Sequence, residues 1–180
     1  TEIIGRNNVV VLSPEEQPIT KGPPVKRRQF FDKMFSVSMA DYVKTLKKYG
    51  RVLKQRNAAL LLVKENKSTV AGLKHWDEQL VDTGARLWLM RVDLITHFKK
   101  NVDYMIQRYD SSIQFEIVYF DEAPREEIYR KQVRDALNTD LTLSRTTVGP
   151  HRDDMLFVWD KRDLRNFGSQ GEHKLALVLL

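Results

Sequence analysis

Two long stretches of helical periodicity constrain the fold of this chain more than any other feature of its sequence. In the first stretch, residues 38–66, seam residues recur at alternating steps of four and three, as in a heptad repeat. We expect a helical rod of roughly 40 Å, at 1.5 Å per residue, with Ser38 as its N-cap. Gly50 within the seam predicts a close approach of two helices, and Asn57 predicts a polar contact. The seam positions are Met39, Val43, Leu46, Gly50, Leu53, Asn57 and Leu60.

The second stretch covers residues 70–109, and a polar connector at 64–69 separates it from the first. Two long helices with a short joint pack as an antiparallel hairpin. Because apolar stripes at helical spacing are the ordinary core of such a hairpin, we assign them no cofactor. The expected buried stripe is Leu73, Trp76, Leu80, Leu87, Leu94, Phe98, Val102 and Met105.

Shorter elements flank the hairpin. Runs of β-branched or alternating apolar residues predict strands at 8–12, 113–119 and 155–159. Pro24 and Pro124 each precede a predicted helix. These helices cover residues 25–35 and 125–141, the second with Ile128, Val133, Leu137 and Leu141 facing inward. A turn at 160–163 leads the chain back along 164–167. The expected fold class is therefore α+β and mainly helical, with the long antiparallel helical hairpin as an arm.

The net charge of +6 is concentrated in one part of the chain. The window from Lys21 to Arg56 holds eleven Lys or Arg and two Asp, a net charge of +9. Such a stripe attracts polyanions, of which nucleic acid is the usual one. A solvated helix face is the alternative interpretation. The candidate DNA-binding residues are Lys26, Arg27, Arg28, Lys47, Lys48, Arg51, Lys54 and Arg56.

Composition excludes several classes of protein. The chain has no cysteine, hence no disulfide framework and no thiolate metal site, which fits a reducing cytoplasm. No apolar run approaches the roughly 20 residues of a membrane span, and the first residues are not a signal peptide. We therefore expect a cytoplasmic protein with no membrane partner. The chain lacks an initial Met and ends on an uncharged, leucine-rich run, which predicts a piece of a larger protein.

Residues 168–171, Gly-Ser-Gln-Gly, form a small turn directly before an apolar run at 175–180 that starts a helix. Unpaired N–H groups and the positive end of the helix dipole attract anions at such a position, phosphate above all. The segment therefore predicts a phosphate-binding turn, with an ordinary glycine-rich turn as the alternative.

A second polar cluster places His151 and Arg152 beside Asp153 and Asp154. One interpretation is a metal or acid–base site. The spacing favours another, a structural turn in which the carboxylates pair with Arg152 or cap backbone N–H groups. The remaining histidines show no matching ligand spacing, so no metal site is expected.

Residues 115–122 imitate a Walker B strand that ends in Asp121 and Glu122. No GxxxxGK[ST] P-loop occurs in the chain, so we expect these two acids to cap the helix after Pro124 instead. No Ser-His-Asp set or nucleophile elbow is present. The sequence therefore predicts no catalytic residue in this chain.

Five segments, in order and spread over nearly the whole chain, resemble the RecF family of bacterial recombinational-repair proteins, which are SMC-like ABC ATPases. The most specific are KQRN and GPHRDD. Family members usually have Gln-Gln-Arg where this chain has Glu172-His173-Lys174. Because a carboxylate would repel bound phosphate, we expect Glu172 to face away or to pair with Lys174. The five segments are VVVLSPEE (9–16), KGPPVKRRQFFD (21–32), YGRVLKQRNAAL (49–60), RTTVGPHRDD (145–154) and FGSQG (167–171).

The resemblance implies an organisation for the chain. Residues 25–145 would be the helical arm, lobe II of the ATPase, with residues 1–24 as a junction and residues 146–180 as the return to the ATPase lobe. The P-loop would precede residue 1 and the Walker B strand would follow residue 180. ATP and Mg²⁺ would therefore bind the full-length parent, and this piece alone would not hydrolyse ATP. The lobe-junction candidates are His151, Arg152, Asp153 and Asp154.

The resemblance also implies a mechanism in which two subunits close head to head around ATP. The signature residues Gly168, Ser169, Gln170 and Gly171 would contact the γ-phosphate held by the other subunit. This ATP-dependent homodimer would clamp DNA at single-strand gaps and duplex junctions, with RecO and RecR as partners that assist RecA loading in repair, recombination, replication and the SOS response. Two alternatives remain: an arm that binds DNA or protein without a nucleotide role, and a purely structural hairpin.

Overall fold

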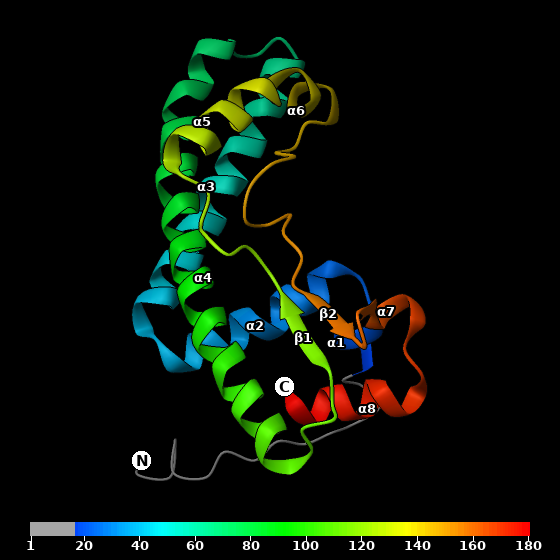
Figure 1. Cartoon of the computed structure of the whole chain (residues 1–180). Helices are drawn as coiled ribbons and strands as arrows, with labels where there is room; N and C mark the ends of the chain where they lie inside the picture. The colour runs from blue at the N-terminus through cyan, green and yellow to red at the C-terminus, as the bar shows by residue number, and fades with distance from the viewer. Residues whose placement is uncertain (1–16) are drawn as a thin grey trace, which may run out of the picture.

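The computed structural model describes residues 17–180, and two long helices dominate it (Figure 1). Helix α3 covers Ala40–Lys64, and α4 covers Lys74–Tyr109 after a 3-10 turn, η2, at Val70–Leu73. The predicted pair of helices and its polar connector are confirmed. The predicted strand at 8–12 lies outside the described residues.

Contacts between α3 and α4 run in opposite order along the two helices. The Arg91 side chain donates to the Tyr42 hydroxyl near the start of α3, at 3.1 Å between Nε and Oη. Towards the other end of α3, Arg56 pairs with Asp77, at 2.7 Å between Nε and Oδ1. The expected antiparallel hairpin is therefore confirmed.

The buried face of α3 differs from the predicted seam by one residue over most of its length. Apolar residues such as Leu46 and Leu53 lie on its flank and are only partly buried. Tyrosine and arginine occupy the buried face because their polar ends find partners there, as the apolar pattern could not indicate. The buried positions are Tyr42, Thr45, Tyr49, Val52, Arg56 and Leu60.

The predicted close approach at Gly50 is wrong. Gly50 is exposed, and a Cβ there would meet nothing within 4 Å. The close approach occurs at Gly84 of α4, where a Cβ would lie 2.6 Å from the Tyr129 ring and 3.2 Å from the Tyr49 ring. Gly84 therefore lets two tyrosines reach the α4 backbone.

A small antiparallel sheet and short helices form the base of the molecule, below the arm in Figure 1. The strand order is β1-β2-β3, with Phe115 opposite Trp159 and Val118 opposite Leu156. The base elements are α1 (Gln17–Lys21), α2 (Pro24–Ser38), β1 (Phe115–Val118), β2 (Leu156–Trp159), β3 (Arg162–Asp163), α7 (Leu164–Phe167) and α8 (Gln170–Leu179).

An aromatic core joins the base to the lower half of α4. The Phe31 ring of α2 packs edge-on against Phe98, at 5.8 Å between centroids, and against Phe157 of β2 at 6.2 Å. Phe115 packs on Trp159 across the sheet, at 5.8 Å between centroids. The fold class, α+β and mainly helical, is confirmed. None of the described helices is both long and apolar enough to cross a membrane.

Two details of the predicted helix ends are corrected. Ser38 does not cap α3: its hydroxyl donates to the Met34 carbonyl one turn earlier, at 3.2 Å, and Met39 occupies the N-cap position. Asp121 and Glu122 do not cap α5, whose N-cap position is Arg125. These acids are too far from the first turn, where two glutamates already complement the helix dipole.

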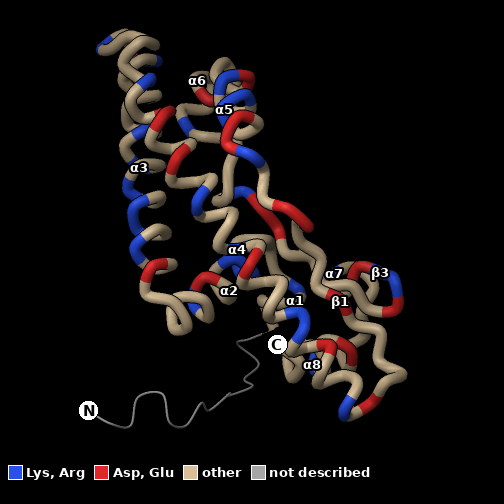
Figure 2. Tube along the Cα trace, turned by 60° about the vertical axis from the view of Figure 1, so that its left-hand side comes forward, with Lys and Arg blue, Asp and Glu red and all other residues tan. Residues whose placement is uncertain are grey.

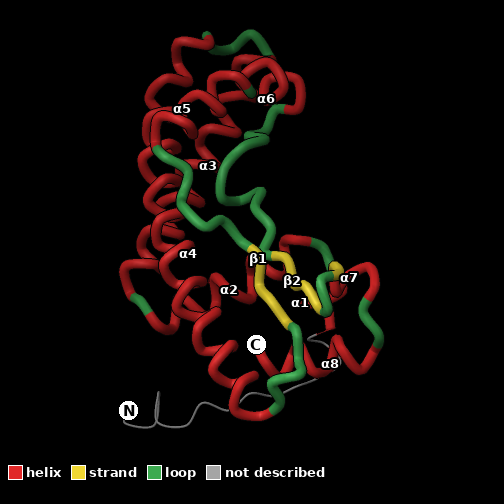
Figure 3. The backbone as a smooth tube through the Cα atoms, in the orientation of Figure 1, coloured by secondary structure: helices red, strands yellow, loops and turns green. Residues whose placement is uncertain are grey.

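The predicted helix over 125–141 is two helices, α5 (Glu126–Asp135) and α6 (Leu137–Leu143), with a break at Ala136. Tyr129 and Val133 of α5 are buried, whereas Ile128, expected to face inward, is half exposed. The break directs α6 onto the far end of the arm. Two long loops, 119–125 and 144–155, connect the sheet with α5 and α6 (Figure 3).

Candidate functional sites

The predicted phosphate-binding turn, residues 168–171, lies on the surface at the start of α8; we call it the glycine turn. Ser169 is the N-cap of this ten-residue helix, and Ser169, Gln170 and Gly171 are exposed. Gly168 is required for packing, because a Cβ there would lie 2.5 Å from the Leu164 carbonyl oxygen. The turn can therefore present a hydroxyl and the first N–H groups of α8 to a ligand outside this chain.

Glu172 neither faces away from the glycine turn nor pairs with Lys174. Its carboxylate accepts from the Ser169 N–H, at 2.6 Å between N and Oε2, and its own N–H donates to the Ser169 hydroxyl at 3.3 Å. This reciprocal pair is a capping box. The hydrogen bond from the Ser169 backbone lowers the pKa of Glu172. An incoming anion thus meets a carboxylate already at the turn.

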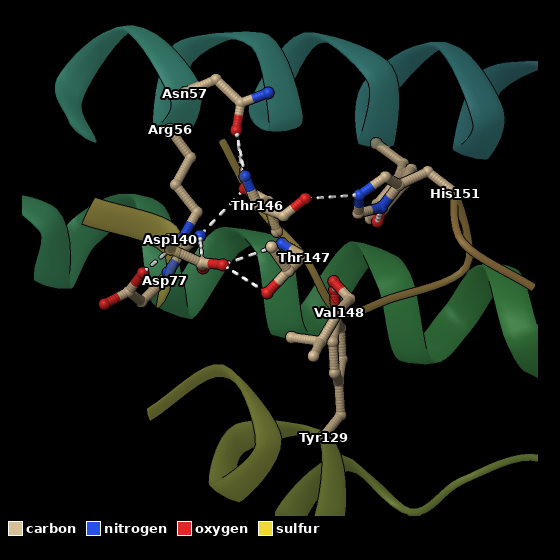
Figure 4. A network of polar contacts seen from close by, with 10 residues as sticks. Arg56, Asn57, Asp77, Tyr129, Asp140, Thr146, Thr147, Val148 and His151 are labelled. Atoms are coloured by element: carbon tan, nitrogen blue, oxygen red, sulfur yellow. Dashed lines mark hydrogen bonds and ion pairs between the residues drawn. The ribbon is translucent and has the colours of Figure 1, made fainter. Parts of the chain in front are cut away.

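The cluster at 149–154 belongs to a longer loop, residues 145–154, which we call the hub loop because it bonds to most of the surrounding elements. Its first half surrounds Arg56 of α3 (Figure 4). Arg56 pairs with Asp140 of α6, at 2.5 Å between Nη1 and Oδ2, and donates to the Thr146 hydroxyl at 2.9 Å. Arg56 and Asp140 are both fully buried. A buried ion pair of this kind depends on both members being present.

Asn57 and Asp140 bind the backbone of the hub loop. The Thr146 N–H donates to Asn57 Oδ1 at 2.8 Å, and the Thr147 N–H donates to Asp140 Oδ1 at 2.8 Å (Figure 4). Both threonine hydroxyls donate to the same oxygens. The polar contact predicted at Asn57 is therefore confirmed.

His151 bridges α3 and the hub loop. Its Nε2 lies 3.1 Å from the Thr146 carbonyl, which can only accept, so Nε2 carries the hydrogen. Nδ1 then accepts from the Tyr49 hydroxyl at 2.6 Å. Burial raises the pKa of Tyr49, which keeps this donor protonated, and burial lowers the pKa of His151 to about 4. His151 is thus neutral and structural near neutral pH.

The two carboxylates at the end of the hub loop bond to side chains of α2 and α4 and to Tyr119, the residue directly after β1. Asp154 accepts two parallel hydrogen bonds from Arg27, at 2.7 and 2.8 Å from Nε and Nη2. Asp153 accepts from Trp88 Nε1 at 2.5 Å and from the Tyr119 hydroxyl at 2.7 Å. Both carboxylates have structural partners, but these come from distant elements, so the predicted pairing with Arg152 and the predicted capping of backbone N–H groups are both wrong.

A third arginine, Arg91 of α4, completes this arrangement. It donates to the Pro150 carbonyl at 2.6 Å and pairs with Asp32 of α2 at 2.9 Å. The pattern of α4 gave no indication of this residue, which lies on a face expected to be apolar. Among the described residues, no cluster of three or more His, Asp or Glu side chains could hold a metal ion.

Two of the predicted DNA-binding residues are not accessible to a phosphate. Arg27 is 2% exposed and Arg56 is fully buried, each held by carboxylates. Arg28 is partly buried and donates to the Asp153 carbonyl. The exposed candidates, which Figure 2 shows mainly as a blue stripe along α3, are Lys26, Lys47, Lys48, Arg51 and Lys54.

Comparison with known proteins gives a consistent result. No protein-family model matches the chain. A protein of Lachnoclostridium phytofermentans named DNA replication and repair protein RecF is 34% identical over 185 residues, which cover 100% of this chain and 50% of the relative. The RecF of Halothermothrix orenii is 34% identical over 195 residues, covering 100% of this chain and 51% of the relative. The chain therefore spans about half the length of these curated relatives.

Solved structures agree with the sequence relatives. A structure described as the recombination mediator protein RecF-ATP in the RecFOR pathway has a TM-score of 0.88 and 29% identity, covering 99% of this chain and 50% of that one. A second RecF structure, described as RecF-ATPrS, has a TM-score of 0.85 and 29% identity, covering 93% and 47%. In sequence and in fold, this chain belongs to the RecF family.

Proposed function

We propose that this chain is the arm-bearing part of an ATP-dependent DNA clamp in recombinational repair. The observation that carries the proposal is the exposure of the glycine turn at the N-terminus of α8. If the turn were buried within this chain, no second subunit could reach it. The naming of the relatives as DNA replication and repair proteins, and of their structures as RecF-ATP, supports the assignment.

The glycine turn would contact nucleotide held by a second subunit. Ser169 would offer its hydroxyl, and Gln170 and Gly171 their N–H groups, to the γ-phosphate. The hydroxyl and N–H donors of the glycine turn fit an anion, and the Glu172 carboxylate occupies the Ser169 N–H. ATP with Mg²⁺ would supply the charge that joins two subunits, while the residues of this chain bind and orient it.

The finer features of the proposal follow from the resemblance. The homodimer would bind DNA at single-strand gaps and duplex junctions, with RecO and RecR as partners that assist RecA loading in the cytoplasm. Residues 25–145 would be the arm, residues 1–24 and 146–180 its connections with the ATPase lobe, and the hub loop the lobe junction. The hydrogen bonds of the hub loop to α2, α3, α4 and α6 support a coupling role for it.

The test uses the full-length parent with Ser169→Arg, a bulky cation at the turn. Sedimentation velocity with and without ATP should show ATP-driven dimers for the parent and monomers for the variant. Ser68→Arg, in the exposed connector between α3 and η2 at the opposite end of the arm, is the matched control and should dimerise normally. Unchanged dimerisation of Ser169→Arg would remove the role proposed for the glycine turn.

A further inference from the structure

One face of α3 is strongly basic and exposed. Its five cations lie within an arc of about 120° on a helix that turns 100° per residue. This basic face points away from the buried seam, and Asp41, in the first turn, is the only carboxylate in α3. The basic face consists of Lys44, Lys47, Lys48, Arg51 and Lys54.

A groove runs beside the basic face, between α3 and α4. Thr45 of α3 and Thr83 of α4 form part of its wall, and Arg86 of α4 lies at its edge. Its volume is about 160 Å³. The α3–α4 groove therefore has room for a phosphate group. It is lined by Asp41, Lys44, Thr45, Lys48, Asp82, Thr83 and Arg86.

The cations of the groove can exchange their partners. Lys44 lies 3.2 Å from Asp41, and Lys48 lies 3.6 Å from Asp82, with all four side chains more than half exposed. Exposed pairs of this kind are weak and screened by salt. Arg86 is exposed and has no ion pair within the described residues 17–180. Its planar fork suits a phosphate better than a lysine does.

We propose that a nucleic-acid backbone lies along the basic face of α3, with one phosphate seated in the α3–α4 groove by Lys44, Lys48 and Arg86. This rests on the proposed DNA-binding function and names its surface. Charge complementarity favours this occupant. The basic face extends about 15 Å from Lys44 to Lys54, and one strand of B-DNA presents about four phosphates over that length. Arg86 enters the set in place of the buried Arg27 and Arg56.

The test measures DNA binding by the 180-residue chain through fluorescence anisotropy, with a fluorescein-labelled duplex that contains a single-strand gap. The groove variant is Lys44→Gln, Lys48→Gln and Arg86→Gln. The control variant, Lys100→Gln, Lys131→Gln and Arg134→Gln, removes the same charge at exposed residues elsewhere. Affinities are compared at salt concentrations from about 50 to 200 mM, the range in which phosphate contacts show a steep dependence.

Each phosphate contact contributes about 0.9 to the slope of log K against log salt. Because the groove seats one phosphate, the groove variant should lower the slope by about 0.9, so that the wild type loses about 3.5-fold more affinity than the variant across this range. The control variant should keep the wild-type slope. Asp41→Asn with Asp82→Asn should act in the opposite direction and tighten binding, because the competing carboxylates are removed.

The outcomes separate the two proposals. The groove and control variants could lose equal affinity, or the groove variant could bind as the wild type does. Either result would show that the α3–α4 groove is not the phosphate site, while the proposed DNA binding would stand. If the wild type binds no DNA at low salt, the DNA-binding function of this chain fails as well. A salt-independent affinity for the DNA would contradict the proposed phosphate contacts. Circular dichroism checks folding, and Arg86→Gln alone carries the test should the triple variant be unstable.

Discussion

The hub loop and the glycine turn are both polar and glycine-containing, but the polar groups of the hub loop bond within the chain, whereas those of the glycine turn face outward. In the hub loop, Asp154 is held by Arg27 and His151 by Tyr49, so the polar atoms are engaged within the chain. In the glycine turn, Ser169 and Gln170 are exposed, and the bonds of Ser169 are to Glu172 in its own helix. The hub loop therefore fixes the fold, and the glycine turn remains accessible to a ligand.

The largest effect is expected where the hub loop meets α3. Arg56→Ala would leave Asp140 fully buried without its cation, and breaking such a pair costs about 3–5 kcal/mol of unfolding free energy. Arg51→Ala, five residues earlier and exposed, is the control and should change stability by less than about 0.5 kcal/mol. Urea unfolding measures both. Similar small losses for the two variants would show that the Arg56 network is not what holds the arm.

The second largest effect should be a dependence of the folding stability on pH. The pKa of His151 is lowered to about 4, so unfolding releases a histidine that binds a proton more readily. Stability should therefore be complete above the unfolded pKa of about 6.5 and decline as the pH falls from there towards 4, by about 2–3 kcal/mol. His151→Asn, which keeps a donor and an acceptor but does not titrate, should flatten this part of the profile. A parallel decline in both proteins would contradict the assignment.

Replacement of a glycine by alanine should have opposite effects on stability in the packed hub loop and on the exposed face of α3. Gly149 has φ +127°, and a Cβ there would collide with the hydroxyls of Tyr129 and Tyr49. Gly149→Ala should destabilise the fold by about 1–3 kcal/mol. Gly50→Ala, where a Cβ meets nothing within 4 Å, should instead stabilise α3 by about 0.5–1 kcal/mol. Thermal unfolding of both variants measures these changes. A Gly149→Ala protein as stable as the wild type would contradict the tight packing of Gly149 against Tyr49 and Tyr129.

The smallest effect on stability is expected at the glycine turn, where hydrogen exchange is the sensitive measurement. Glu172→Ala removes the acceptor for the Ser169 N–H and should speed exchange of that amide, with little change in melting temperature. Glu172→Gln keeps an acceptor without the charge and should protect the amide better than Ala. Equal protection in all three proteins would mean that the capping box does not persist in solution.

The sequence predicted the elements better than their buried faces. The hairpin, the two main strands, the N-terminal Pro24 of α2 and the polar contact at Asn57 follow from local patterns, and the structure has them. The buried face of α3 was displaced, because Tyr49 and Arg56 carry polar ends on long apolar side chains. A prediction based on apolar residues alone assigns the positions of such side chains to the exposed face of the helix.

The long helical hairpin, the basic α3 and the glycine turn before α8 can be predicted from the residues alone, because helical period, charge and turn chemistry are local properties. Which arginines are structural depends instead on contacts between segments that lie far apart in the chain. Arg27 meets Asp154 across 127 residues of sequence, and Arg56 meets Asp140 across 84. A charge can be buried only where a partner offsets its lost hydration, and that partner is supplied by the fold.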